Sequence, residues 1–390
     1  YEPGLEEIVK RNLKQGRLKF SYNVSNSIRK SNIIFICVGT PINKKTNAAN
    51  LKYVFQVAEK IKYNLNNYKI IVTKSTVPVT TGDKIENILK KNKFKSKFDV
   101  ISNPEFLREG EAIRDFRYPD RIVIGSNDDK VFKVLKKLYL PLINKGAKFY
   151  TTTRRGAELV KYASNAFLAT KITFINELSN LCEKSDINVE DIALGMGSDE
   201  RIGSRFLRAG PAYGGSCFPK DTKGLVSTAE KFKIDLSVVK AVIKSNQNRK
   251  TLHIKRIDKI IGKNLINKKI VFLGVTFKPN TDDMRDSTSL DMIPYLVKKG
   301  AKIAYYDPTG EKKEFKKLKN CKFNSSVKDI CKKADLIILH TEWDEFKSLD
   351  FKKLIKKKSF KIFDLRNLYN FNEMINKKIK YYSVGRPSIN

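Results

Sequence analysis

The sequence predicts an α/β protein with two Rossmann-like, doubly wound domains joined by a long central helix and a helical dimerisation domain. Apolar runs of β-type residues alternate with helical patterns in the first and last thirds of the chain, whereas the middle third carries helical patterns and no strand signal. Most of the apolar runs show little alternation with polar residues, which is typical of strands buried on both faces of a parallel sheet. A chain of 390 residues is long enough for two or three such domains.

The first third, residues 1–152, is expected to form the first of these domains. We expect five strands, at Ile33–Val38, Ile70–Thr73, Phe98–Ser102, Arg121–Ile124 and Lys148–Thr151. Helical patterns lie between several of them, for example at 51–63 and 82–91. Three strands end in polar stretches, namely VGTP (38–41), KSTVP (74–78) and SNPEFLREG (102–110). These loops are candidate site loops, because ligands bind at the carboxyl ends of strands in doubly wound sheets.

The middle third, residues 153–262, is expected to be helical. An amphipathic pattern runs without a break over Arg155–Lys184, and further helices are expected at Asn188–Met196, after Pro219 and at Ser237–Ile261. The apolar face of the long helix needs a partner, and a second copy of the chain is the simplest one. We therefore expect a homodimer.

The last third, residues 263–390, returns to the α/β pattern. The expected strands lie at 268–277, Lys302–Tyr306, Asp335–His340 and Lys361–Phe363. A helix is expected at Ser287–Lys299, with Gly300 directly after its end. The loop between the first of these strands and this helix is polar and carries Lys278 and Arg285.

The composition narrows the kinds of molecule that this protein is expected to bind. The net charge of +37 comes mostly from lysine spread along the whole chain, so we expect no specific nucleic-acid partner, although weak salt-dependent binding is expected. The five scattered cysteines lack a CxxC pair, and the two histidines are isolated, which argues against disulfides, a metal site or a Ser-His-Asp arrangement. No apolar run has the length of a membrane span and the first residues do not resemble a signal peptide, so we expect a cytoplasmic protein without a membrane partner.

The stretch YGGSCFPKD (213–221) raises the question of a reactive cysteine. Gly214 and Gly215 let the backbone approach a ligand closely or adopt a positive φ, and Pro219 suits the first turn of a helix. Cys217 would then lie just before a helix start, where the helix dipole and free N–H groups favour a thiolate. On these residues alone, an activated nucleophile and a buried structural cysteine both remain open.

A feature expected of a dinucleotide-binding domain is absent. No glycine-rich turn between a strand and a helix precedes Ile33, and the glycines upstream of it are Gly4 and Gly16. Either the first third is not a nucleotide-binding domain or the chain is an N-terminally truncated fragment.

Taken in order, ten stretches of the chain resemble the UDP-glucose 6-dehydrogenase family, within the UDP-glucose/GDP-mannose dehydrogenases. They are YEPGL (1–5), CVGTP (37–41), KSTVP (74–78), SNPEFLREG (102–110), PDRIVIG (119–125), KYASNAFLATKI (161–172), RIG (201–203), YGGSCFPKD (213–221), FKPNTDDMRDS (277–287) and TEWDEF (341–346). They are spread over nearly the whole chain, and the resemblance favours the truncated-fragment interpretation.

The resemblance implies a four-electron oxidation of UDP-glucose to UDP-glucuronate with NAD as cofactor. An aldehyde loses hydride readily once a thiolate has added to it, so Cys217 would carry the second step through a thiohemiacetal and a thioester. Lys161 and Asn165, one turn apart on the long helix, would stabilise the oxyanions. Asp221 would organise water and protons with Lys161, and Glu105, helped by Thr76, would activate water for thioester hydrolysis.

The resemblance also implies binding residues. The positions expected to face NAD are Val38, Thr40, Thr76, Glu109, Lys220 and Arg285. The positions expected to contact UDP-glucose are Glu105, Phe106, Leu107, Lys161, Asn165, Arg201, Tyr213, Gly214, Lys278 and Arg366. Arg201 is further expected to reach the partner subunit's site.

Two other functions stay open. A sister enzyme would oxidise GDP-mannose or a UDP-N-acetyl-hexosamine by the same chemistry, and assays with each nucleotide sugar separate the two. A non-catalytic basic binding protein on the same fold would bind nucleic acid without turnover. The presence of Cys217, Lys161 and Asn165 together argues against the second alternative.

Overall fold

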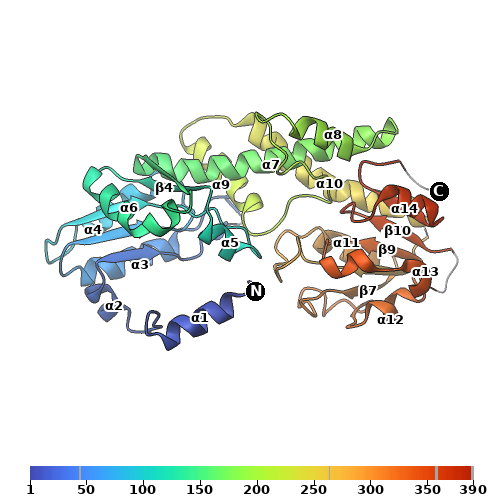
Figure 1. The fold of residues 1–390 in the computed structure, drawn as a ribbon, viewed down its shortest axis with the longest axis horizontal. Coiled ribbons are helices and arrows are strands. Elements are labelled where there is room, and N and C mark those ends of the chain that lie inside the picture. Colours follow the sequence, from blue (N-terminus) through green and yellow to red (C-terminus); the bar gives the residue numbers. More distant parts are fainter. Residues whose placement is uncertain (44, 263, 356–358, 388–390) are drawn as a thin grey trace. The chain divides into compact units, whose positions relative to one another are not determined.

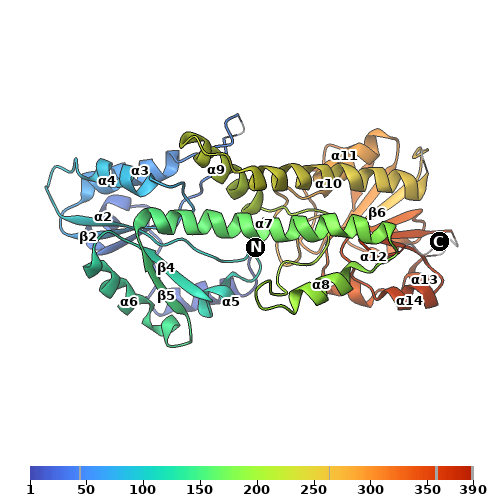
Figure 2. The same cartoon turned by 90° about the horizontal axis from the view of Figure 1, so that it is seen from above.

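The computed structural model describes residues 1–43, 45–262, 264–355 and 359–387 (Figure 1). The chain forms two compact units. The first comprises Tyr1–Ala166 and Lys220–Leu236, and the second Phe167–Pro219 and Ser237–Asn390. The helix α7 (Arg154–Lys184) contributes its first part to one unit and its remainder to the other, and Figure 2 shows it along its length.

The first unit is built on a five-stranded sheet in the order β1-β2-β3-β4-β5. The strands are β1 (Ile33–Ile36), β2 (Lys69–Thr73), β3 (Phe98–Ser102), β4 (Arg121–Gly125) and β5 (Lys148–Thr152). The pairs β1–β2, β2–β3 and β4–β5 are parallel. Ile36 is in register with Thr73 and Thr73 with Ser102, so the loops that follow β1, β2 and β3 leave one edge of the sheet side by side.

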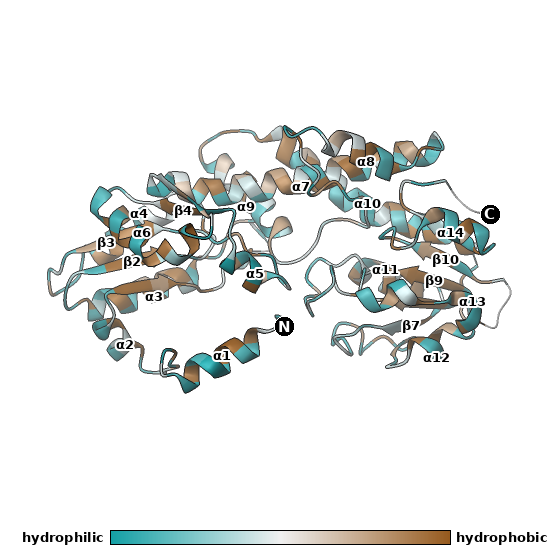
Figure 3. Ribbon diagram, in the orientation of Figure 1, coloured by the Kyte–Doolittle hydropathy of each residue, from teal (hydrophilic) through white to brown (hydrophobic). Residues whose placement is uncertain are grey.

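Helices cover both faces of this sheet. The helices of the unit, besides its part of α7, are α1 (Leu5–Lys14), α2 (Val24–Lys30), α3 (Lys52–Asn64), α4 (Thr81–Leu89), α5 (Ala112–Arg117), α6 (Asp129–Ile143) and α9 (Phe218–Lys231). Alternate residues of β2 face opposite sides, because successive strand side chains point to opposite faces. Ile71 joins the core formed with α3 and α4, whereas Ile70 and Val72 join the core formed with α6. Residues 70–72 of β2 are accordingly all apolar, and Figure 3 shows hydrophobic segments in this sheet.

One pairing in the first sheet was not expected. The strands β3 and β4 meet antiparallel at Ser102 and Gly125. The connection between them holds the short helix α5, which buries no residue. A parallel pair needs a crossover connection that packs on the sheet, usually as a helix, and α5 does not supply one.

The second unit carries a six-stranded sheet in the order β11-β10-β9-β6-β7-β8, and all of its pairs are parallel. The strands are β6 (Lys269–Leu273), β7 (Lys302–Tyr306), β8 (Cys321–Phe323), β9 (Leu336–Leu339), β10 (Lys361–Asp364) and β11 (Lys380–Ser383). From β6, the strands β7 and β8 are added on one side. The chain then returns to the other side of β6, where β9, β10 and β11 are added in turn. The carboxyl ends of β6 and β9 therefore form a topological switch point, where doubly wound sheets bind ligands.

The helices of the second unit surround this sheet. They are the rest of α7, α8 (Val189–Gly197), α10 (Ser237–Ile261), α11 (Ser289–Lys298), α12 (Val327–Cys331), the 3₁₀ turn η1 (Asp344–Ser348), α13 (Phe351–Leu354) and α14 (Phe371–Asn376). Two apolar cores lie on the two faces of the sheet, and β6 again contributes alternate residues, Phe272 to one and Val271 to the other. In the part of the chain that the structure describes, no helix is both long and apolar enough to cross a membrane.

The observed elements confirm the predicted fold class of two Rossmann-like sheets with a long central helix. β3, β7 and α10 have the predicted bounds, and α7 begins one residue earlier than expected. The short edge strands β8 and β11 and the helix α1, which buries no residue, were not predicted. Each lacks the sustained apolar pattern on which the sequence predictions depended. The division into three domains is not tested by this structure and remains a prediction.

Candidate functional site

The predicted site residues are divided between the two units, and the first group lies at the carboxyl edge of the first sheet. The loops after β1 and β2 are joined there by hydrogen bonds. The Thr40 hydroxyl donates to the Thr76 carbonyl at 2.9 Å, and the Ser75 hydroxyl donates to the Val38 carbonyl at 2.7 Å. This brings together Val38, Thr40 and Thr76, three of the residues expected to face the cofactor. Glu109, another of them, lies in the turn that precedes α5.

Glu105, in the loop after β3, meets the long helix. The Nζ atom of Lys161 lies 3.6 Å from Oε1 of Glu105, and the backbone N–H of Leu107 donates to Oε2 at 2.6 Å. The Phe106 ring lies under two cations, with the Arg121 guanidinium 4.1 Å and the Lys161 ammonium 5.2 Å from its centre. Lys161 is buried, so its charge acts on these neighbours with little screening by water.

Asp221 is fully buried in the first turn of α9 and is held by two partners. The amide of Asn165 donates to its Oδ2 at 2.6 Å, and the ammonium of Lys220 contacts its Oδ1. Lys161 and Asn165 thus lie one turn apart on α7 and face different carboxylates, Glu105 and Asp221. The structure pairs Asp221 with Asn165 and Lys220 rather than with Lys161. Lys220 was expected to contact the cofactor. Its ammonium instead neutralises the buried carboxylate of Asp221.

Cys217 belongs to the second unit and directly precedes α9. Its Sγ atom lies 3.5 Å from Oγ of Ser216, and the side chain is partly exposed. Pro219 falls in the first turn of α9, as the sequence predicted. The position immediately before a helix is one where N–H groups and the helix dipole favour a thiolate.

The two glycines before Cys217 serve different purposes. A Cβ on Gly214 would lie 2.6 Å from the carbonyl oxygen of Asp286, so this position requires close approach of two backbones. Gly215 has φ +81°, and its N–H donates to the Arg285 carbonyl at 2.8 Å. The predicted positive φ is therefore present at Gly215, whereas the close approach at Gly214 is to another segment of backbone. They fix the path of the chain into Cys217.

The remaining substrate candidates surround the second sheet. The Arg366 guanidinium, after β10, donates to the carbonyls of His340 at 2.8 Å and Phe277 at 2.5 Å, and it lies 3.0 Å from Glu342. Burial lowers the pKa of Arg366. One side chain thus ties together the loops after β6, β9 and β10.

Four further candidates differ in how they are held. Tyr213 is buried and its backbone exchanges two hydrogen bonds with the Asn246 side chain, at 2.9 and 3.0 Å. Lys278 lies beside the Phe277 ring. The guanidinium groups of Arg285 and Arg201 are largely exposed, and Asp283 and Asp199 respectively hold them.

Two groups near the first set were not identified from the sequence. Lys74 was quoted in the KSTVP stretch but given no role, and its ammonium donates to Oδ1 of Asn103 at 3.1 Å. Glu158 on α7 is buried and accepts the N–H groups of Thr80 at 2.8 Å and Gly82 at 2.7 Å, at the start of α4. Burial raises the pKa of Glu158 to about 7. A lysine directly after an apolar strand was the available signal for Lys74, whereas Glu158 reads in sequence as an ordinary helix residue.

Comparison with known proteins agrees with this arrangement. Three family models match, for the UDP-glucose/GDP-mannose dehydrogenase family: its NAD-binding domain over residues 1–143, its central domain over 155–248 and its UDP-binding domain over 271–371. A UDP-glucose 6-dehydrogenase of Rhizobium meliloti is 44% identical over 99% of this chain and 89% of its own length. One of Bacillus subtilis is 41% identical over 100% of this chain and 88% of its own length.

Solved structures extend the comparison. A UDP-glucose dehydrogenase from Pyrobaculum islandicum superposes with a TM-score of 0.90 at 32% identity, over 99% of this chain and 87% of that one. A UDP-D-ManNAc dehydrogenase from Pyrococcus horikoshii, at 22% identity and a TM-score of 0.81 over 99% of this chain and 88% of that one, shares the fold. From the matched domains and the identity to curated relatives, the chain belongs to the UDP-glucose/GDP-mannose dehydrogenase family and is an NAD-dependent oxidoreductase.

Proposed function

We propose that this enzyme oxidises UDP-glucose to UDP-glucuronate in two successive hydride transfers, with Cys217 as the nucleophile of the second. The observation that carries the proposal is the start of α9, where Cys217 directly precedes the helix and Asp221 in its first turn is bound by Asn165. The curated relatives at 41–44% identity are UDP-glucose 6-dehydrogenases, which favours this substrate over GDP-mannose or a UDP-N-acetyl-hexosamine.

The residues at the first sheet fit a nicotinamide dinucleotide. The register of β1, β2 and β3 aligns three loops at one edge, which is the edge where such folds bind dinucleotides. Val38, Thr40, Thr76 and Glu109 would contact the cofactor in this unit, and Arg285 is proposed as a further contact to NAD. Bound NAD would accept the hydride in each of the two steps.

In the first step, side chains of the enzyme assist the removal of the proton from the sugar's 6-hydroxyl. The 6-hydroxyl of the sugar loses its proton as hydride leaves C6, and an aldehyde results. Lys161 and Asn165 stabilise the oxygen as negative charge develops on it. Asp221, neutralised in part by Lys220, orders the water that carries the proton away.

In the second step the Cys217 thiolate adds to the aldehyde carbon and a thiohemiacetal forms. Loss of the second hydride leaves a thioester on Sγ. Glu105, assisted by Thr76, takes a proton from water, which attacks the thioester carbon. The carboxylate product leaves and the thiolate is regenerated, so that water supplies the added oxygen and two NAD molecules take up the four electrons.

The second unit would supply recognition of the UDP-sugar. Arg366 and Lys278 bring positive charge to the carboxyl edge of the second sheet, and Tyr213 and Gly214 lie on the segment that leads to Cys217. Phe106 and Leu107 are proposed as further contacts to the sugar. Cations suit a diphosphate because charge-assisted hydrogen bonds are the strong ones.

A homodimer through the helical middle is part of the proposal. Phe174 and Leu181 on α7 and Leu194 on α8 are large apolar side chains that are 48%, 60% and 71% exposed, and burying them against a second copy of the chain would stabilise a dimer. The Arg201 side chain, 89% exposed, would reach the partner subunit's site. A cytoplasmic location is proposed because all five cysteines are free.

A panel of nucleotide sugars tests the substrate. The full-length protein is incubated with NAD and either UDP-glucose, GDP-mannose or a UDP-N-acetyl-hexosamine, and NADH absorbance is followed. We expect the highest kcat/KM with UDP-glucose. A higher value with one of the others would assign the enzyme to that substrate instead.

A further inference from the structure

Arg121 is the first residue of β4 and has no part in the mechanism above. Its guanidinium lies 4.1 Å from the centre of the Phe106 ring, in the loop after β3. The same guanidinium donates to the hydroxyl oxygen of Ser164 on α7 at 3.3 Å. One side chain therefore joins the start of β4, the loop after β3 and the long helix.

The antiparallel contact of β3 and β4 explains how Arg121 reaches this loop. The contact pairs Ser102, the last residue of β3, with Gly125, the last residue of β4. Because the two strands run in opposite directions, going back along β4 to Arg121 follows the direction in which the chain continues from Ser102 to Phe106. In a parallel pair, the start of β4 would lie at the opposite edge of the sheet.

Phe106 lies among groups assigned to the reaction. The Lys161 ammonium is 5.2 Å from the centre of its ring, and the same ammonium is 3.6 Å from Oε1 of Glu105, the residue before Phe106. Lys161 and Ser164 lie on one face of α7, because residues three apart on a helix are neighbours. Arg121, Phe106 and α7 thus form a closed set of contacts around the ring.

An arginine suits this place better than a lysine would. The guanidinium group is planar, so it can stack on an aromatic face while its N–H groups bind elsewhere. A cation within about 6 Å of a ring centre is attracted to the electron-rich face of the ring. The Phe106 side chain is only partly buried, so the stacked guanidinium supplies a constraint that close packing gives to a ring in the core.

We propose that Arg121 is a positioning residue that holds the Phe106 ring in place to contact the sugar of UDP-glucose. The inference rests on the contact proposed above between Phe106 and the sugar. Arg121 acts through the ring. The requirement at this position is for a stacked guanidinium, and positive charge alone does not meet it.

A neighbouring cation offers a matched control. Lys145 and Arg121 line the same surface pocket. The Lys145 ammonium lies over a different ring, 5.1 Å from the centre of Tyr118. Replacing Lys145 therefore removes one positive charge near Arg121 and leaves the stack on Phe106 in place, so it measures any general attraction of the anionic substrate.

The test measures the equilibrium Kd of UDP-glucose and of NAD by calorimetry for the full-length parent, Arg121→Met, Arg121→Lys and Lys145→Met. We expect Arg121→Met to raise the Kd of UDP-glucose about fivefold, because the stack is lost. Arg121→Lys should raise it nearly as much, because an ammonium does not replace a stacked guanidinium. The Kd of NAD should change less than about twofold in both variants, because the proposed NAD contacts are unchanged. Lys145→Met should leave both Kd values at those of the parent.

A double-mutant cycle with Phe106→Ala tests whether Arg121 acts through the ring. Phe106→Ala should itself weaken binding of UDP-glucose. Adding Arg121→Met to it should then raise Kd by less than about 1.5-fold, because the two residues share one interaction. A general structural role for Arg121 would instead give the same factor in both backgrounds.

Four results would overturn the inference. They are parent affinity for UDP-glucose in Arg121→Met, parent affinity in Arg121→Lys, an equal loss of affinity in Lys145→Met, and an undiminished effect of Arg121→Met when Phe106 is already alanine. The second and third would show that charge, rather than stacking, is what matters.

Phe106→Ala also separates this failure from failure of the proposed sugar contact. If Phe106→Ala binds UDP-glucose like the parent, both that contact and the role of Arg121 are wrong. If Phe106→Ala binds weakly and Arg121→Met binds like the parent, the contact stands and the inference about Arg121 fails. Oxidation of UDP-glucose is tested on the parent protein, so failure of the proposed reaction is seen without any variant.

Discussion

The carboxyl edges of the two sheets are built by different means. In the first unit, charged and polar side chains face one another: Lys161 with Glu105, and Asp221 with Lys220 and Asn165. In the second, one arginine binds backbone carbonyls, and a glycine brings two segments of backbone into contact. Facing charges suit proton transfer and oxyanion stabilisation, whereas a backbone scaffold suits recognition. The second unit also carries Cys217, the proposed nucleophile, on a path that the glycines fix.

The two edges also differ in where their functional groups come from. The first draws on α7 and α9 as well as on three strand ends, and these helices are distant in sequence from the loops that they meet.

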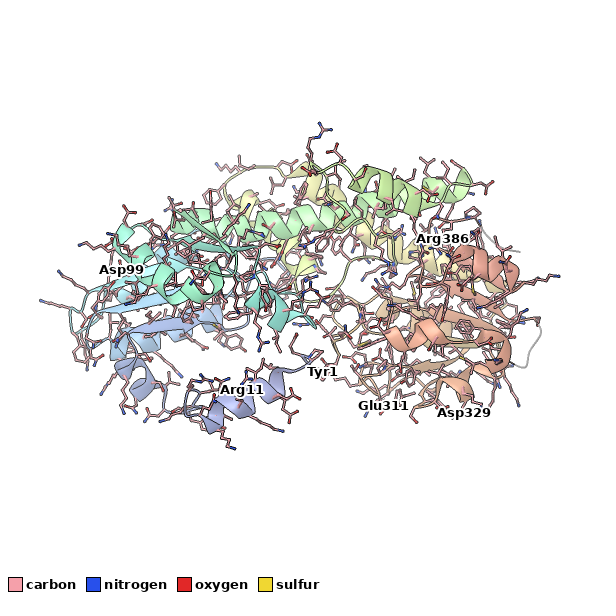
Figure 4. The ribbon with its side chains drawn as sticks, in the orientation of Figure 1. Tyr1, Arg11, Asp99, Glu311, Asp329 and Arg386 are labelled. Carbon is pink, nitrogen blue, oxygen red and sulfur yellow. The ribbon has the colours of Figure 1, made fainter. Side chains whose placement is uncertain are left out.

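Figure 4 labels Asp99, near the start of β3, where it accepts a hydrogen bond from the Tyr68 hydroxyl at 2.6 Å. That end of the strand lies away from the site, and its polar contact is local. In the second unit, the labelled Arg386 is similarly structural, since it is buried and donates to the Tyr369 carbonyl at 2.9 Å.

The largest effect is expected from Cys217→Ser, which removes the proposed nucleophile, Sγ, and leaves the surrounding backbone unchanged. A serine hydroxyl is far less acidic than a thiol and is seldom ionised near neutral pH without a strong base. The second oxidation should fall by orders of magnitude while binding of UDP-glucose and NAD is retained. Intact mass should show the aldehyde, or a slowly hydrolysing ester, trapped on the protein. A serine variant that makes UDP-glucuronate at close to the parent rate would show that Cys217 is not the nucleophile.

An intermediate effect is expected from Gly214→Ala, which disturbs a backbone contact and leaves the proposed catalytic side chains unchanged. The new Cβ would lie 2.6 Å from the Asp286 carbonyl oxygen, so backbone must move, at a cost of about 1–3 kcal/mol. The melting temperature and kcat/KM should both fall.

The control for this variant is Gly195→Ala. Gly195 lies in α8, and a Cβ there would meet nothing within 4 Å. Gly195→Ala should therefore leave the free energy of unfolding unchanged or raise it by up to about 1 kcal/mol. Equal melting temperatures for the two variants would contradict the role given to close backbone contact.

An effect on stability, and not on the proposed catalytic groups, is expected from Glu158→Gln, through the dependence of stability on pH in the first unit. Burial raises the pKa of Glu158 from 4.5 to about 7, so between these values the folded protein holds a proton that the unfolded chain releases. The stabilisation is present below about pH 4.5 and is lost as pH rises to about 7, a change of about 3 kcal/mol. Glutamine cannot ionise and should lack this dependence. Melting temperatures of both proteins at pH 5 and pH 7.5 measure it, and identical pH responses would exclude Glu158 as its source.

Much of the fold could be predicted because its strands are continuous apolar runs. Phe98–Ser102 and Lys302–Tyr306 were predicted with their observed bounds. The antiparallel contact of β3 and β4 could not, because strand direction depends on how the connecting segment packs. Within the site, Cys217, its glycines and the helix after it follow from local backbone rules. The pairing of Asp221 with Asn165 and that of Glu105 with Lys161 depend on long-range packing that no local pattern records.

The measurement that tests the account most directly is the number of NADH molecules formed for each UDP-glucose consumed. The full-length protein is given a limiting amount of UDP-glucose and excess NAD, and NADH absorbance is compared with the UDP-glucuronate recovered. Because the aldehyde is proposed to remain on Cys217 until the second hydride has left, we predict two NADH and one UDP-glucuronate for each UDP-glucose, with no free aldehyde. A ratio of one, with aldehyde accumulating in solution, would contradict the central claim.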